Sequence, residues 1–297
     1  MNGGMWGAMW AWLSGTRLEV LPGFEELLES GGLTDYERLM RAEVGDRISL
    51  EAENEVRRIE LGEPGATRSF FLKRSWERIP ASWVLKKALR GRRQHSRAYL
   101  ELTAVRELEE RGYAVMRAAA WGERMERGIP TEGFLLVEGI DGVAADELWR
   151  GADRELRTRM LRDLGDLLGR LHRDGLFAFV RFKDLVCRSV PEAVDAPIDW
   201  VQIDRACSRE GARRRTPARC VDALAESYVG LLKGAPLPDD DELGVLARSY
   251  LAASGDFPSG GPEALVEGIR RETARKFPRE VERADAAAAP AAAGEAR

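Results

Sequence analysis

Apolar and polar residues alternate along two neighbouring stretches in the first part of the chain. Residues 46–62 form the first stretch, and residues 69–74 form the second, which ends at Lys73 and Arg74. Turn residues at 63–65 separate them, so the pattern predicts a hairpin of two strands. Shorter apolar stretches predict three further strands, at residues 113–116, at 133–137 and within 198–206.

Elsewhere the apolar positions recur three and four residues apart, as on one face of a helix. This spacing predicts helices within residues 24–43, 83–111, 155–173, 218–233 and 240–253. Strands therefore gather in the first half with one long helix among them, and helices gather in the second half. We expect an α+β, bilobal fold with a small strand-rich N-lobe over 44–138 and a helical C-lobe over 139–277. Residues 1–43 would be an N-terminal extension, and the Ala-rich residues 278–297 a disordered tail.

Composition narrows the classes of function. The 297 residues carry 46 basic and 50 acidic side chains, a net charge of −4, which disfavours a nucleic-acid partner. Three cysteines without metal-ligand spacing disfavour both a disulfide scaffold and a zinc site and favour a cytoplasmic location. The uncharged segment 5–13, with three tryptophans, is too short to span a membrane.

Four charged residues occur in an order that suits phosphoryl transfer. Lys73 lies in a strand, Glu101 in the following helix, Asp184 after the long helix of 155–173, and Asp204 at the end of a short strand. Phosphoryl transfer from ATP requires a lysine at the phosphates, a glutamate that holds it, an aspartate at the acceptor hydroxyl and another on magnesium. We interpret the four residues as candidates for these roles, in the chain order of protein-kinase-like folds.

The chain resembles the lipopolysaccharide kinase (Kdo/WaaP) family of bacteria. The resembling segments are residues 70–74, Glu101 with Gly112, 134–138, 171–175, Asp184, 203–206 and 214–225. The resemblance implies ATP and Mg²⁺ as cofactors, with Lys73 at the α- and β-phosphates, Glu101 orienting Lys73, Asp184 at the acceptor hydroxyl and Asp204 on magnesium. It also implies that backbone near Glu138 holds adenine, that the acceptor is a sugar hydroxyl of a lipid-linked saccharide, and that the protein acts at the cytoplasmic face of the inner membrane.

Several positions depart from that family. Phe182 stands where the family has the histidine of His-Arg-Asp, and Ser189 offers only a neutral oxygen where a second magnesium ligand is expected. Asp199 is an alternative to Asp204 as the metal ligand. A G-x-G-x-x-G loop is missing, and the glycines of the 62–65 turn would cover the phosphates instead.

These departures keep other functions open. Phe182 and Ser189 favour a pseudokinase or docking module with little or no turnover. A small-molecule kinase of the same fold would instead need an acidic acceptor pocket. Two basic segments, residues 86–97 and 205–219, are candidates for contact with an anionic membrane surface or simply solvated faces.

Overall fold

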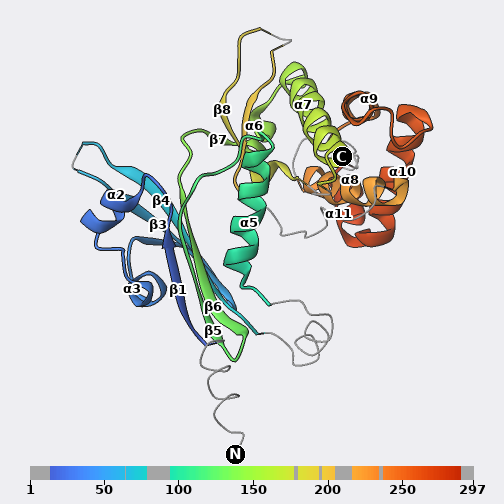
Figure 1. Cartoon of the computed structure of the whole chain (residues 1–297). Coiled ribbons are helices and arrows are strands. Elements are labelled where there is room, and N and C mark those ends of the chain that lie inside the picture. Colours follow the sequence, from blue (N-terminus) through green and yellow to red (C-terminus); the bar gives the residue numbers. More distant parts are fainter. Residues whose placement is uncertain are drawn as a thin grey trace, which may run out of the picture. The chain divides into compact units, whose positions relative to one another are not determined.

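The computed structural model describes residues 14–63, 65–78, 94–176, 180–193, 196–204, 216–233 and 237–288. The chain divides into two compact units, Met1–Ile140 and Asp141–Arg297. The division lies close to the lobe boundary that the sequence predicts. Each unit is described by itself below, with the element labels of Figure 1.

A six-stranded sheet forms the N-terminal unit, in the order β1-β5-β6-β4-β3-β2 with antiparallel neighbours. Its strands are β1 (Gly15–Val20), β2 (Asp46–Glu51), β3 (Asn54–Leu61), β4 (Arg68–Trp76), β5 (Ala118–Glu126) and β6 (Ile129–Glu138). The predicted hairpin is therefore confirmed as β3 and β4. The predicted strand at 113–116 is reduced to an isolated bridge at Val115, and the paired strand β5 begins at Ala118.

Helices cover both faces of this sheet (Figure 1). α2 (Glu25–Ser30) and α3 (Tyr36–Arg41) pack on one face, where Phe24, Leu28 and Leu39 are buried with Phe70. α5 (Arg97–Glu110) packs on the other face. Successive side chains of a strand point to opposite faces, so Phe70 faces α2 and α3 while its neighbour Phe71 faces α5.

The expectation that residues 1–43 form an extension is corrected by this packing. β1 pairs with β5 along its length, and α2 and α3 supply fully buried side chains to the core. Burying those apolar side chains stabilises the unit by about 2 kcal/mol each. The part of this segment from residue 15 onward therefore belongs to the N-terminal domain, while the Trp-rich residues 5–13 lie outside the described residues.

In the C-terminal unit, a three-stranded sheet accompanies a group of helices. The strands, in the order β7-β8-β9, are β7 (Val143–Ala144), β8 (Leu185–Ser189) and β9 (Asp199–Gln202). The helices are α6 (Ala145–Gly151), α7 (Arg154–Arg173), the one-turn η1 (Phe182–Asp184), α8 (Pro217–Leu232), α9 (Asp240–Ser254), α10 (Gly261–Lys276) and α11 (Pro278–Ala288). The tail expected to be disordered from 278 is corrected, because α11 is helical to Ala288 and buries Ala284.

In the C-terminal unit, helices α7 and α9 pack closely against each other. A Cβ at Gly165 would lie 2.4 Å from the carbonyl oxygen of Leu246, and one at Gly169 would lie 2.6 Å from that of Tyr250. The two glycines therefore let the helix backbones approach closely. One turn on from these contacts, buried His172 shares a hydrogen bond of 2.9 Å between its Nδ1 and the Tyr250 hydroxyl.

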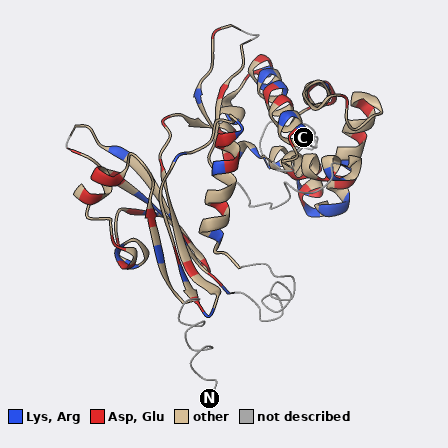
Figure 2. Ribbon diagram, viewed as in Figure 1, with Lys and Arg blue, Asp and Glu red and all other residues tan. Residues whose placement is uncertain are grey.

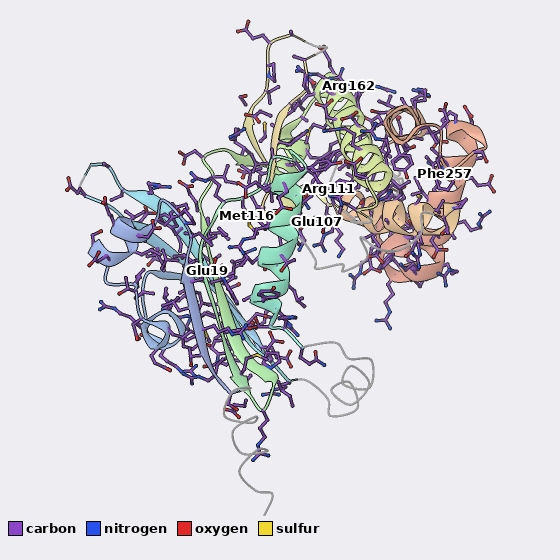
Figure 3. The ribbon with its side chains drawn as sticks, in the orientation of Figure 1. Glu19, Glu107, Arg111, Met116, Arg162 and Phe257 are labelled. Carbon is purple, nitrogen blue, oxygen red and sulfur yellow. The ribbon has the colours of Figure 1, made fainter. Side chains whose placement is uncertain are left out.

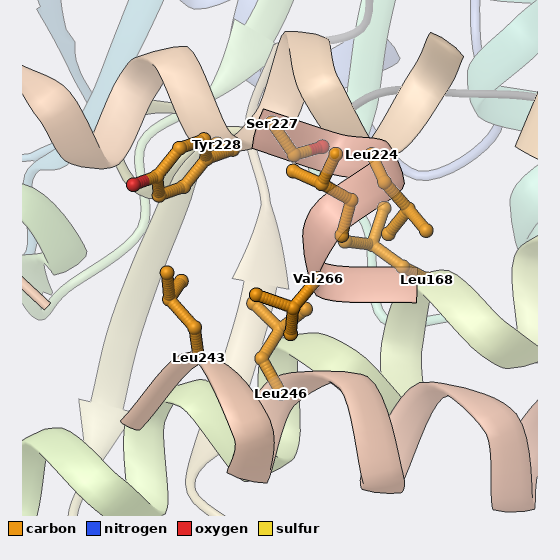
Figure 4. A pocket seen from close by; sticks show the side chains of 8 residues that line it. Leu168, Leu224, Ser227, Tyr228, Leu243, Leu246 and Val266 are labelled. Carbon is orange, nitrogen blue, oxygen red and sulfur yellow. The ribbon is translucent and has the colours of Figure 1, made fainter. Parts of the chain in front are cut away.

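A small apolar cavity remains where α7, α8, α9 and α10 meet (Figure 4). Its lining includes Leu168, Tyr228, Leu246 and Val266, and the cavity volume is about 10 Å³. That volume is at the lower limit for a single water molecule. The cavity is therefore a packing gap of the helical core and has no room for a substrate.

Charged residues of both signs are interspersed over the described parts of both units (Figure 2). Figure 3 shows one such pair on α5, where the Arg111 guanidinium lies 3.2 Å from the Glu107 carboxylate. Of the two predicted basic segments, only residues 94–97 and 216–219 fall within the described residues. No helix among the described residues is long and apolar enough to cross a membrane.

Candidate functional site

Lys73 and Glu101 form an ion pair in the N-terminal unit. Lys73 lies on the face of β4 that packs against α5, and its Nζ is 2.6 Å from Oε1 of Glu101. The side chains are 23% and 15% exposed, so both groups remain within reach of a ligand. The two residues are 28 positions apart in sequence, and the strand and helix that carry them bring them together as the sequence predicts.

The glycine turn at 62–65 lies far from this pair. β3 pairs with β4 so that Lys73 is opposite Val56, while Leu61 is opposite Arg68 at the glycine end of the hairpin. Lys73 and Arg68 are five residues apart along β4, about 16 Å at the rise of a strand. The expectation that Gly62 and Gly65 cover phosphates bound at Lys73 is therefore wrong.

A different turn lies near Lys73, and it is acidic. Asn54, at the start of β3, is opposite Ser75, two positions from Lys73 on β4. Glu51 at the end of β2 and Glu53 in the β2–β3 turn therefore lie at this end of the sheet. Their carboxylates disfavour bound phosphates, although the Arg97 guanidinium, 3.0 Å from Glu53, offsets one of the two charges. Sequence analysis missed this turn, although the predicted hairpin places the end of its second strand, and with it Lys73, away from the connecting turn.

Glu138 ends β6, and its side chain is engaged by two arginines. Arg68 forms a close ion pair with it, and Nη1 of Arg117 lies 3.4 Å from its Oε2. The backbone amide of Glu138 donates to the carbonyl of Arg117 at 2.8 Å, and that of Gly139 donates to the carbonyl of Ser69 at 2.6 Å. Adenine binding by this segment would therefore use carbonyl groups or the amides that follow Gly139.

In the C-terminal unit, Asp184 is buried and bound to Arg181. The residue is 3% exposed. Its Oδ2 accepts from the backbone amide of Arg181 at 3.0 Å and from Nε at 2.8 Å, and its Oδ1 accepts from Nη2 at 3.0 Å. A carboxylate offers about four acceptor positions, and three are taken here. Arg181 is a residue of the site that sequence analysis missed, and its only signal was the spacing of three residues.

Asp184 and Asp204 lie at the same end of the β8–β9 ladder. Leu185 is opposite Gln202, and the amide of Ile203 donates to the carbonyl of Asp184 at 3.0 Å. Asp204 follows directly and its side chain is exposed. Magnesium on a nucleotide needs only one or two protein carboxylates besides the phosphates, so Asp204 is chemically suited to hold it.

Ser189 and Asp199 lie at the other end of that ladder, opposite each other. Ser189 is four residues from Leu185, about 13 Å along the strand, whereas two ligands of one Mg²⁺ lie within about 4 Å of each other. The expectation that Ser189 shares a metal with Asp204 is therefore wrong. Asp199 accepts two hydrogen bonds from Arg188, at 2.8 and 2.9 Å, so it is the weaker alternative to Asp204.

Part of the chain matches a known protein family. Residues 50–177 match the Lipopolysaccharide kinase (Kdo/WaaP) family. This stretch contains the Lys73–Glu101 pair and Glu138, and it ends before Asp184 and Asp204. The match shows that this segment of the chain is similar to the Kdo/WaaP lipopolysaccharide kinase family.

The fold of this chain is similar to that of a solved WaaP structure. A structure of WaaP in complex with acyl carrier protein superposes with a TM-score of 0.56 over 88% of this chain and 99% of that chain, at 17% sequence identity. The predicted protein-kinase-like fold is thereby confirmed. The BubR1 kinase domain gives a TM-score of 0.40 over 82% of this chain and 83% of that chain, at 10% identity. No curated protein matches the chain.

Proposed function

We propose that the protein is an ATP- and Mg²⁺-dependent kinase that phosphorylates a sugar hydroxyl of lipopolysaccharide or a related lipid-linked saccharide. The observation that carries the proposal is the 2.6 Å pair between Lys73 and Glu101. A lysine held by a helix glutamate on the sheet of the smaller lobe is the arrangement that binds nucleotide phosphates in kinases. The Kdo/WaaP family match covers this same segment and supplies the acceptor class.

Each candidate residue has a role in this proposal. Lys73 neutralises the nucleotide phosphates, Glu101 orients Lys73, and the backbone near Glu138 holds adenine. Asp204 binds the magnesium ion, which offsets the negative charge of the phosphates during transfer. Asp184 orients the acceptor hydroxyl or receives its proton.

The partner proposed for this activity is the lipid-linked saccharide itself, met at the cytoplasmic face of the inner membrane. Basic residues near an anionic surface contribute about 1 kcal/mol each to such an encounter. WaaP has been solved in complex with acyl carrier protein. A carrier protein is therefore a second kind of partner worth including in binding assays.

A second candidate is a nucleotide-binding module with little or no turnover. Two observations favour it. Asp184 is buried and already accepts three hydrogen bonds from Arg181, and the turn beside Lys73 carries Glu51 and Glu53 instead of glycines. A general base must reach the proton it accepts, so a locked carboxylate favours binding without transfer.

Thermal unfolding with and without Mg-ATP tests nucleotide binding in both candidates. Ligand at 100 times its Kd adds about 2.7 kcal/mol to the stability of the native state. We expect this shift in the wild type and in Asp199→Asn, and its loss in Asp204→Asn. An equal shift in both variants would contradict metal binding by Asp204, and the absence of a shift in the wild type would contradict both candidates.

Transfer itself separates the kinase from the binding module. Purified lipopolysaccharide or its lipid-linked saccharide core is incubated with the protein and with ATP labelled at the γ-phosphate. Label on the saccharide that disappears in Lys73→Ala supports the kinase. Nucleotide binding without label transfer supports the second candidate.

A further inference from the structure

Arg97 joins the acidic β2–β3 turn to the first turn of α5. Its Nη1 donates to Oδ1 of Asn54 at 3.1 Å, and its Nη2 lies 3.0 Å from Oε2 of Glu53. Sequence analysis placed Arg97 in a basic segment that is a candidate for contact with an anionic membrane surface or simply a solvated face. The structure instead places its guanidinium between polar groups of the same unit.

A third partner anchors the same residue to the end of β4. The backbone amide of Arg97 donates to Oε1 of Glu77 at 2.7 Å, and its Nε lies 3.9 Å from the other oxygen of that carboxylate. The Glu77 side chain is only 7% exposed, so it needs such partners. Through Arg97 the start of α5 is thus tied to the β2–β3 turn and to the end of β4, which lie together at the end of the sheet beyond Lys73.

Glu101 follows Arg97 by one turn of the same helix. Residues four positions apart lie one above the other on a helix face. The contacts of Arg97 therefore add to the packing of buried Ala98 and Leu102 in holding the turn that carries the Glu101 carboxylate. The Arg97 side chain is 51% exposed, and exposed ion pairs contribute little to global stability. Its contacts are better suited to setting a position than to stabilising the fold.

We propose that Arg97 is a positioning residue, which holds α5 so that Glu101 meets Lys73. The inference deepens the proposed nucleotide site and rests on it for its functional meaning. The positioning role does not depend on turnover, because Lys73 and Glu101 are in contact without any ligand. Replacing Arg97 by alanine removes the guanidinium contacts to Asn54 and Glu53 and leaves the backbone bond to Glu77, so the first turn of α5 is held less tightly and Glu101 restrains the Lys73 amine less.

Reactivity of the Lys73 amine measures this directly. Wild type, Arg97→Ala and Arg106→Ala are treated with a trace of acetic anhydride, and acetylation of Lys73 is quantified by mass spectrometry relative to exposed Lys233. Arg106 is a matched control, because it lies on the same helix, is 44% exposed and forms one ion pair, with Glu19 at 2.8 Å. We expect about threefold faster relative labelling of Lys73 in Arg97→Ala, no change in Arg106→Ala, and labelling near the wild-type rate in Arg97→Lys.

Binding of Mg-ATP to the same variants gives the functional readout. We expect about a fivefold higher Kd in Arg97→Ala with an unchanged unfolding temperature. Unchanged labelling of Lys73, or a fold defect in Arg97→Ala and in the milder Asn54→Ala together, would overturn the positioning role. If the wild type binds no Mg-ATP, the proposed function fails, and the labelling rates still decide the role of Arg97.

Discussion

Replacing Asp184 by asparagine tests whether its carboxylate serves catalysis or the stability of the fold. The substitution keeps the size of the side chain and removes the charge that faces the Arg181 guanidinium at 2.8 and 3.0 Å. Hydrogen bonds to charged groups contribute about 1.5–3 kcal/mol each, and breaking a buried pair costs about 3–5 kcal/mol. The Arg181 side chain is 27% exposed and partly solvated after the change. The expected loss in the free energy of unfolding is therefore about 2–3 kcal/mol.

The assay is urea denaturation of the full chain, with thermal unfolding as a second probe. A loss of this size lowers the unfolding temperature by about 5–10 °C in a domain of this size. Asp166→Asn is the matched control, since its exposed i,i+4 pair with Arg170 at 2.8 Å stabilises by less than about 0.5 kcal/mol. Unchanged stability of Asp184→Asn together with lost phosphoryl transfer would refute the structural reading and establish Asp184 at the acceptor.

Three further outcomes follow from the packing and the charges. Gly169→Ala should lower the free energy of unfolding by about 1–3 kcal/mol, because the new Cβ would lie 2.6 Å from a carbonyl of α9. Gly151→Ala should be neutral in the same denaturation assay, because nothing lies within 4 Å of a Cβ there. Lys73→Ala should abolish the Mg-ATP shift yet change stability by less than about 1 kcal/mol in urea, since the pair is partly solvated; a large loss would make Lys73 structural. Burial alone would raise the pKa of Glu55, but hydrogen bonds from Arg74 and Arg47 lower that pKa below its ordinary 4.5. The ionised Glu55 carboxylate therefore stabilises the fold above pH 4.5, and this stabilisation is lost as the pH falls through the lowered pKa. Glu55→Gln should therefore show less loss of stability between pH 5 and pH 3 than the wild type, and equal slopes in urea titrations would contradict this.

The Lys73–Glu101 pair could be predicted from sequence because the four charged residues follow the chain order of protein-kinase-like folds. Local patterns add only that Lys73 lies in a strand and Glu101 in a helix. The 2.6 Å contact itself depends on how α5 packs on the sheet, which the local patterns do not specify.

The identity of the turn beside Lys73 could not be predicted in this way. The predicted hairpin already places Lys73 away from the turn at 62–65, but which residues lie opposite Lys73 depends on strand register, and the register is set by pairing with neighbours on both sides, including β6. Glycines suggested the wrong end of the hairpin, because they mark any tight turn and not the one near a particular side chain. The same limit hid Ser189, which is only five residues after Asp184 in sequence but at the opposite end of the β8–β9 ladder from Asp204.

The hydrogen bonds to Asp184 depend on the conformation of the Arg181 side chain, which no local sequence pattern specifies. A Cβ at Gly230 of α8 would lie 2.9 Å from Cγ of Arg181, so that glycine leaves room for the arginine stem. The amide of Val180 is held by the Ser227 hydroxyl at 3.0 Å, which fixes the residue before Arg181. A contact assembled from α8 and η1 becomes visible only when the fold is known.

The two halves of the proposed machinery differ in their geometry. The nucleotide half retains its ion pair and lies within the Kdo/WaaP match, whereas the acceptor half begins where that match ends. Release of Asp184 to an acceptor would require breaking hydrogen bonds to Arg181, and the substrate would have to replace them at each turnover. A kinase can meet that cost only if acceptor binding supplies it, which predicts that ATP binds without acceptor while Asp184 is released only in the ternary complex. Stability and transfer measured on Asp184→Asn together decide whether evolution kept this carboxylate for chemistry or for the fold.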